Sequence, residues 1–156
     1  MPVILRTNSD NPDFKKLTDE LDIELCRIYS TNPEDYEEYN RITGLSTVVL
    51  AYENEEAVGC GCFKIFNDKA IEIKRMFIVE EQRGKGIASS ILAELETWAK
   101  ELGYSKAVLE TGKGQPHAIN LYEKYGYQRT ENYNQSDALD ISVCLEKVLQ
   151  PATKNA

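Results

Sequence analysis

The chain has 156 residues, the usual size of one domain with a single core. It is 42% hydrophobic and 28% charged, a balance typical of a folded globular protein and unlike that of a disordered one. Acidic residues outnumber basic ones, 26 to 18, and the net charge of -8 argues against general binding to nucleic acids. We expect one domain over residues 1–150 and a tail over 151–156.

The sequence carries little sign of membrane, metal or disulfide chemistry. No apolar run approaches the ~20 residues that cross a bilayer, and the first residues lack a signal-peptide pattern, so we expect a cytoplasmic protein without membrane contact. Cys26, Cys60, Cys62 and Cys144 are expected to be reduced and buried. A single histidine, His117, makes a zinc site a poor prediction and removes catalysis by Ser-His-Asp or Cys-His.

The N-terminal part predicts a strand followed by two helices. The strand covers Val3–Arg6. Asn11-Pro12 predicts a capped helix start, and Asn32-Pro33 repeats that signal before a short surface helix over Glu34–Ile42. The first helix has an apolar stripe made of Leu17, Leu21, Leu25 and Ile28.

Three strands follow, because the residues become β-branched and aromatic. They cover Thr47–Tyr52, Val58–Phe66 and Ile71–Val79. The polar connections Glu53–Glu56 and Asn67–Lys69 have the length of hairpin loops. These strands are therefore predicted to form an antiparallel meander.

The C-terminal part alternates between helices and strands. A helix begins after Gly84 and stops at Gly103; its stripe is Ile87, Ile91, Leu95, Trp98 and Leu102. A second helix follows a strand and ends before Gly126, and two strands close the domain; these elements are Ala107–Glu110, Pro116–Lys124, Tyr127–Arg129 and Leu139–Leu145. The order βααβββαβαββ predicts an α/β (α+β) fold, with helices on the faces of a mixed sheet.

The segment Met76–Ala88 joins a hydrophobic strand to a helix through a glycine-rich turn. The first turn of a helix has N–H groups without partners and carries the positive end of the helix dipole. A phosphate or pyrophosphate can bind there. Gly84 and Gly86 would let the ligand approach the backbone, and Arg83 and Lys85 would add positive charge.

Other glycine-rich patterns fit less well. A P-loop needs Ser or Thr after Gly-Lys, where this chain has Gly86. A dinucleotide fingerprint needs a third glycine where this chain has Ser89, and its strand would open a βαβ unit instead of ending a meander. A glycine-rich helix start without a ligand is the remaining alternative.

Two motifs in order resemble those of the GNAT superfamily of acyl-CoA-dependent N-acyltransferases. The family's pyrophosphate motif is Arg or Gln, two residues, Gly, one residue, then Gly or Ala, and Arg83–Ala88 matches it. A second family element, a small residue before Leu-Tyr-Glu-Lys-x-Gly and an aromatic residue, is matched by Ala118–Tyr127. The similarity runs from about Val3 to Leu149, although the N-terminal helices match only in type and order.

The resemblance implies a sheet that splays apart between Ile71–Val79 and Ala107–Glu110, with CoA in the opening. Asn120 would contact the pantetheine arm from one wall. Three residues on the other wall would pair with it through their backbones, as an added strand would: Phe77, Ile78 and Val79. The pyrophosphate would bind the loop made of Arg83, Gly84, Lys85, Gly86, Ile87 and Ala88.

Acyl transfer to an amine also needs a base, because an alkyl ammonium has a pKa of about 10.4. Glu72 matches the glutamate that is the base in some family members, directly or through water, and Glu110 is the second candidate. Alternatively, Glu72 is paired with Lys74 or simply solvated. Regular alternation places Glu72 on one strand face with Lys74, Met76 and Ile78.

Tyr122 occupies the tyrosine position of the second motif and is the candidate acid for the leaving thiolate. The alternative is that it only packs on the cofactor. Tyr125 and Tyr127 are expected to be packing residues, and His117 to be solvated unless it faces the acceptor pocket.

The sequence therefore predicts an enzyme that transfers acetyl from acetyl-CoA to a primary amine of a small molecule, peptide or protein, by direct attack in a ternary complex and without a metal. The alternative is a catalytically inactive CoA-binding sensor or interaction module. Acceptor-facing residues are expected in Asp10–Gly44, Gly112–Gln115 and Asn132–Asp137. The acidic composition mildly favours a cationic acceptor, and exposed edge strands could pair in a homodimer.

Overall fold

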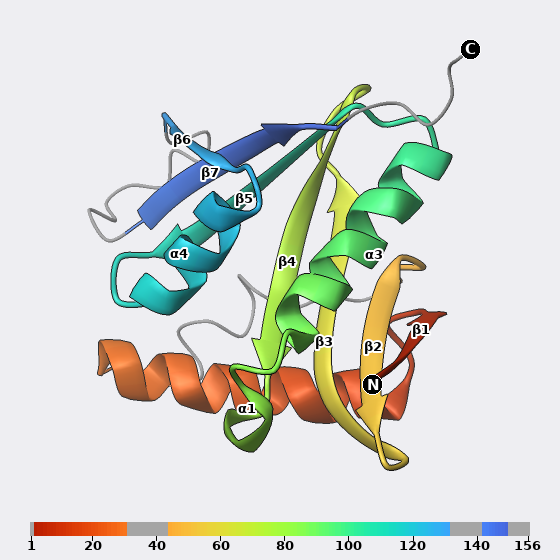
Figure 1. Ribbon diagram of the computed structural model, residues 1–156, viewed down its shortest axis with the longest axis vertical. Helices are drawn as coiled ribbons and strands as arrows, with labels where there is room; N and C mark the ends of the chain where they lie inside the picture. Colours follow the sequence, from red (N-terminus) through yellow and green to blue (C-terminus); the bar gives the residue numbers. More distant parts are fainter. Residues whose placement is uncertain (1, 31–43, 132–141, 150–156) are drawn as a thin grey trace. The chain divides into compact units, whose positions relative to one another are not determined.

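The computed structural model describes residues 2–30, 44–131 and 142–149 (Figure 1). Their elements are β1 (Val3–Thr7), α1 (Pro12–Tyr29), β2 (Val48–Glu53), β3 (Glu56–Ile65), β4 (Ala70–Ile78), the 3₁₀ turn η1 (Glu80–Gln82), α3 (Ile87–Glu101), β5 (Lys106–Gly112), α4 (Pro116–Lys124), β6 (Gln128–Thr130) and β7 (Ser142–Val148). The predicted α/β class with a mostly antiparallel sheet is confirmed. The helix predicted over Glu34–Ile42 and the tail over 151–156 lie outside the described residues.

The chain divides into two compact units. The first is drawn from Met1–Phe63 and Arg75–Leu95, and the second from Lys64–Lys74 and Glu96–Ala156. β3, β4 and α3 each begin in one unit and end in the other. The glycine-rich loop Arg83–Ala88, the candidate phosphate loop, belongs to the first unit, and Tyr122 belongs to the second.

Helix α1 begins where the sequence predicted. The side chain of Asn11 accepts a hydrogen bond from the N–H of Asp13 at 2.9 Å, and proline occupies the first turn. The helix ends at Ser30, whose φ of 54° cannot continue an α-helix. The apolar stripe predicted for this helix is wrong at Ile28, which is 40% exposed. The buried face begins at Phe14, one turn before Leu17, the first residue of the predicted stripe.

In the first unit, α1 covers one face of neighbouring strands in the order β1-β2-β3-β4. The β1/β2 and β2/β3 pairs are antiparallel, as the meander required. A two-residue turn, Asn54-Glu55, joins β2 to β3 with φ of 51° and 68°, the positive pair typical of a type I′ hairpin. The α1 face of the core contains Phe14, Leu17, Leu21, Val48, Leu50, Cys60, Cys62 and Phe77.

The first turns of α3 pack on the other face of the same strands. The side chains of Ile78 and Ile91 lie over Gly59, which alternates along β3 with the buried Cys60. The predicted α3 stripe is wrong at Leu102, which is 54% exposed. The helix ends at Glu101 and the chain turns through Gly103 at φ 97°, so Ala99 takes the last buried position.

The second unit contains the strand order β4-β5-β7-β6. β4 pairs with β5 in parallel over Ala70–Ile73 and Lys106–Leu109, whereas β5/β7 and β7/β6 are antiparallel. β7 extends to Val148, beyond the predicted end at Leu145. Splaying of the sheet beyond the β4/β5 pairs stays a prediction.

All four cysteines are free thiols, but only three of them are buried. Cys26 is partly exposed on α1, contrary to the prediction. Burial, aided by the neighbouring Cys62, raises the pKa of the Cys60 thiol, which therefore stays protonated at neutral pH.

Candidate active site

The loop between η1 and α3 has the backbone that the sequence predicted for an anion site. Gly84 and Gly86 have φ of 81° and 84°, in the left-handed region that favours glycine. A Cβ on Gly84 would meet nothing within 4 Å, and one on Gly86 would meet only Ser89 Oγ at 3.9 Å. Conformation, and not lack of space, therefore requires glycine at both positions.

The start of α3 presents unpaired N–H groups. Within the part of the chain that the structure describes, the N–H groups of Ile87, Ala88 and Ser89 donate to no carbonyl, and the first paired one is Ser90, bonded to Gly86 at 3.1 Å. The hydroxyls of Ser89 and Ser90 also donate to the Gly86 carbonyl, at 2.9 and 3.1 Å. Three backbone donors thus stand at the positive end of the helix dipole.

The Arg83 side chain binds the protein itself. Its Nε donates to the Ile78 carbonyl at 2.8 Å, Nη2 donates to Glu24 Oε1 at 2.7 Å, and the guanidinium lies 5.5 Å from the centre of the Phe77 ring. Lys85 is exposed, with Nζ 3.2 Å from Gln82 Oε1. Of the two cations predicted for the loop, Lys85 is the one without an ionic partner among the described residues.

Some backbone groups at the end of β4 already form hydrogen bonds within the protein. Phe77 and Ile78 are buried, and the N–H of Val79 donates to the Val58 carbonyl at 2.9 Å. Because Arg83 already binds the Ile78 carbonyl, the predicted pairing of Phe77, Ile78 and Val79 with pantetheine would have to use their other backbone groups or displace these bonds.

Glu72, the candidate base, is a buried carboxylate in the second unit. It is 5% exposed and faces Val108 in the β4/β5 register, so the solvated alternative is wrong. The strand alternation assumed for Glu72 is not regular, because Arg75 has φ 59°. Glu110 lies on β5 opposite Cys144 of β7 and is partly buried.

Tyr122, the candidate acid, lies on α4 and is 6% exposed. Burial raises the pKa of its phenol. Its ring meets the Tyr127 ring edge-on, with 5.8 Å between centroids and 65° between planes. Tyr127 is buried as predicted, but Tyr125 is 39% exposed.

Tyr127 takes part in a hydrogen-bond network that the sequence analysis did not predict. Its hydroxyl donates to Glu96 Oε2 at 2.8 Å, and Lys147 Nζ donates to Glu96 Oε1 at 2.9 Å. Burial, followed by the Glu96 charge, raises the pKa of Tyr127. On the same helix as Tyr122, Asn120 and His117 are exposed, as expected for residues that meet solvent or a ligand.

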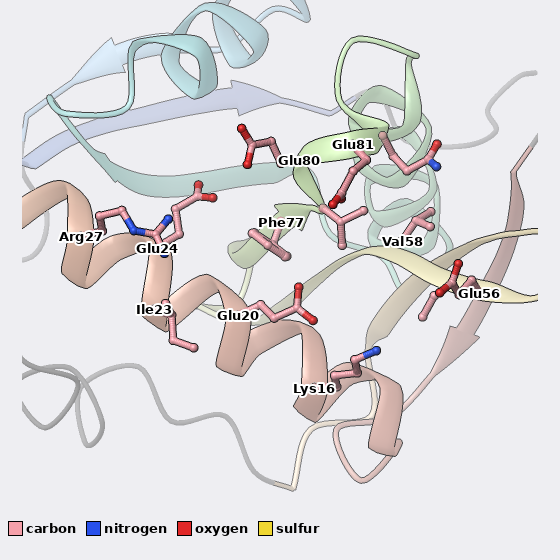
Figure 2. Close-up of a pocket in the computed structure, with 13 residues that line it drawn as sticks. Lys16, Glu20, Ile23, Glu24, Arg27, Glu56, Val58, Phe77, Glu80 and Glu81 are labelled. Carbon is pink, nitrogen blue, oxygen red and sulfur yellow. The ribbon is translucent and has the colours of Figure 1, made fainter.

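A cavity of about 530 Å³ lies within the first unit (Figure 2). Its α1 wall falls inside Asp10–Gly44, the range expected to face the acceptor; the cavity as such had no signal in the sequence. The lining residues are Lys16, Glu20, Ile23, Glu24, Arg27, Glu56, Ala57, Val58, Phe77, Val79, Glu80, Glu81 and Gln82.

The described residues include no group of three or more His, Cys, Asp or Glu side chains that could hold a metal ion. No helix among the same residues is long and apolar enough to cross a membrane.

Residues 14–127 match the model of the Acetyltransferase (GNAT) family. The chain is 30% identical over 142 residues to an IAA acetyltransferase of Azospirillum brasilense, a match that covers 86% of this chain and 89% of that protein. The matches to the other curated relatives span 27% to 56% of the length of those proteins.

Solved structures share the fold over most of the chain. A crystal structure from Klebsiella pneumoniae subsp. pneumoniae, assigned as an acyl-CoA N-acyltransferase, is 26% identical with a TM-score of 0.79 and covers 96% of this chain and 99% of its own. A GNAT family acetyltransferase from Elizabethkingia anophelis with acetyl-CoA bound is 27% identical with a TM-score of 0.57, over 66% and 76% of the two chains. The chain therefore belongs to the GNAT family of acetyltransferases, within the acyl-CoA N-acyltransferase class of enzymes.

Proposed function

We propose that the protein transfers an acetyl group from acetyl-CoA to a primary amine by direct attack in a ternary complex. The observation that carries this is the start of α3, where a glycine-rich loop leaves three N–H groups free for an anion. A pyrophosphate would accept several of these donors at once, with Lys85 nearby as an exposed cation. Acetyl-CoA supplies the activated acetyl thioester to this arrangement.

Glu72 and Tyr122 are assigned the proton transfers. Glu72, directly or through water, takes one proton from the ammonium form of the acceptor, and the neutral nitrogen then bonds to the thioester carbonyl carbon. Tyr122 gives its proton to the sulfur as the carbon–sulfur bond breaks. The nitrogen then loses its second proton to the phenolate, which restores Tyr122, and Glu72 releases the first proton to solvent. The products are an acetamide and CoA thiol. Both side chains are buried, which suits groups that act away from bulk water.

Backbone and α4 groups are assigned to hold the donor. Phe77, Ile78 and Val79 would align the pantetheine arm, and Asn120 would contact it. These assignments follow the family resemblance. They are consistent with the exposure of Asn120 and with the Val58–Val79 hydrogen bond that keeps the end of β4 extended.

The test is acetyl-CoA turnover across a panel of amines, followed by the free thiol that is released. We expect amine-dependent release with at least one acceptor, together with acetyl-CoA binding in calorimetry. Binding without release from any amine would instead indicate the inactive sensor or interaction module. Absence of binding would reject both interpretations.

A further inference from the structure

We propose that the cavity formed by α1, the start of β3 and the segment Phe77–Gln82 binds the acceptor, and that this acceptor is a small alkyl amine with at least two positive charges. The inference rests on the proposed function, because it names the substrate class of that transferase. Every lining residue belongs to the first unit.

The shape of the cavity suits a small ligand with an apolar chain. Its volume of about 530 Å³ lies within the ~300–1,000 Å³ typical of ligand pockets. Apolar side chains supply part of the wall, namely those of Ile23, Ala57, Val58, Phe77 and Val79. Ile23 is 54% exposed, so an alkyl chain lying against it would remove open apolar surface from water.

The charged part of the lining is unbalanced. Five carboxylates stand against two cations, Lys16 and Arg27, which leaves three negative charges. If Arg83, the ion-pair partner of Glu24, is added to the two cations, an excess of two negative charges remains. A ligand with two positive charges would neutralise that excess, whereas one ammonium would neutralise half of it.

The four remaining carboxylates come from three elements and have no partner among the described residues. Glu20 lies on α1, Glu56 on β3, and Glu80 and Glu81 on η1. None of these four carboxylate groups forms an ion pair or a hydrogen bond with the described residues. Figure 2 shows Glu20 on α1, Glu56 on β3 beyond Val58, and Glu80 and Glu81 on the turn that follows β4. A bound polycation would place its positive charges among these four carboxylates.

The cavity also extends to the end of β4, where the pantetheine arm of acetyl-CoA is proposed to bind. Phe77 and Val79 line it, and the backbones of the same residues are proposed to align the pantetheine arm. One ammonium of a diamine could stay between the carboxylates while the other nitrogen, deprotonated, reaches the thioester. An acceptor with its own carboxylate would be repelled from the same wall.

The test compares three amines of equal chain length: 1,4-diaminobutane, n-butylamine and 4-aminobutanoate. We expect kcat/KM to fall in that order, at least about tenfold from the first to the second. Added salt should reduce the diamine advantage, because the carboxylates are solvent-accessible. Equal or better use of n-butylamine or 4-aminobutanoate would overturn the inference.

Glu20→Gln and Glu81→Gln identify the cavity as the origin of the preference. Each should raise KM for 1,4-diaminobutane about fivefold to tenfold and leave acetyl-CoA affinity unchanged. Asp19→Asn is the matched control, because Asp19 neighbours Glu20 on α1, is exposed, and does not line the cavity. Equal effects of Asp19→Asn and Glu20→Gln on KM would contradict a specific site.

Calorimetry separates this inference from the proposed function. 1,4-Diaminobutane should bind the complex with CoA, and Glu20→Gln should weaken that binding about fivefold or more. Binding that depends on Glu20 without turnover would keep the cation site and reject the transferase. Turnover of other amines without diamine binding would reject the cation site and keep the transferase.

Discussion

Arg83 is bound to Glu24, a residue 59 positions earlier in the chain, through a hydrogen-bonded ion pair of 2.7 Å. The same guanidinium holds the Ile78 carbonyl through Nε. One side chain thus ties the glycine loop to α1 and to the end of β4. The arginine of the pyrophosphate motif therefore has a structural role in this chain that the motif alone does not indicate.

Arg83 and Lys85 are expected to differ when each is changed to Gln. Arg83→Gln should lower the unfolding free energy by about 1 kcal/mol, because it removes an ion pair and a bond to a carbonyl. Lys85→Gln should leave stability unchanged and weaken CoA binding, most strongly at low salt. Thermal melts and calorimetry at two ionic strengths measure both effects. Equal stabilities of the two variants would contradict the tie formed by Arg83.

Gly86→Val should abolish acetyl-CoA binding. A β-branched residue at φ 84° is strained, so the loop would change conformation and move the N–H donors of α3. Gly103→Val is the control, since Gly103 also has a positive φ with open space around it but lies at the other end of α3. Both variants should lose stability, and only the first should lose calorimetric binding. Micromolar affinity retained in Gly86→Val would remove the phosphate-loop proposal.

Local signals in the sequence were sufficient for much of the fold. Proline at its start and Gly126 beyond its end set the predicted bounds of α4, which the structure reproduces. The positive φ angles of Gly84 and Gly86 likewise follow from the loop pattern. The prediction that Leu102 belongs to the buried stripe was wrong, because periodicity does not indicate which turn of a helix is the last buried one.

Long-range relationships were not predictable in the same way. The partners of Arg83 and Glu96, and the wall that α1 adds to the cavity, depend on tertiary packing between segments far apart in sequence. The irregular backbone at Arg75 was also missed. Its guanidinium is held by Asp22 and the Thr18 carbonyl on α1, contacts that no local pattern indicates.

Tyr52→Phe should destabilise the protein in a pH-dependent way. The Tyr52 hydroxyl donates to Asp13 Oδ2 at 2.7 Å, and burial, together with that bond and the Asp13 charge, raises the pKa of Tyr52 to about 12. A raised pKa means stability that is fully present below the ordinary value of about 10 and lost as pH rises through 12. The difference in unfolding free energy, about 1 kcal/mol at neutral pH, should therefore shrink between pH ~10 and ~12. A difference that stays constant over that range would reject this linkage.

Glu72→Gln should lower kcat by about 10²-fold and leave acetyl-CoA affinity unchanged, because the amide cannot take the proton from the amine. The deficit should narrow as pH rises toward about 10, where solvent deprotonates alkyl amines. Glu110→Gln is the comparison that assigns the base. A larger loss in Glu110→Gln than in Glu72→Gln would transfer the role to Glu110.

Tyr122→Phe should lower kcat by about 10²-fold or more while acetyl-CoA affinity stays nearly unchanged. The variant retains the ring that meets Tyr127 and loses only the proton donor. Because burial raises the pKa of Tyr122, the phenol stays neutral over an assay range of about pH 6 to 9. Its ionisation should therefore produce no alkaline loss of wild-type activity in that range.

Tyr125→Phe is the matched control for the acid assignment, since Tyr125 belongs to the same motif but is exposed. It should keep wild-type kcat and the wild-type pH profile. If Tyr122→Phe also turned over at the wild-type rate, the thiolate would leave without help from the phenol, and Tyr122 would be a packing residue of α4. A higher KM for acetyl-CoA at unchanged kcat would lead to that same conclusion, because it would show that the hydroxyl contributes to ground-state binding and not to proton transfer.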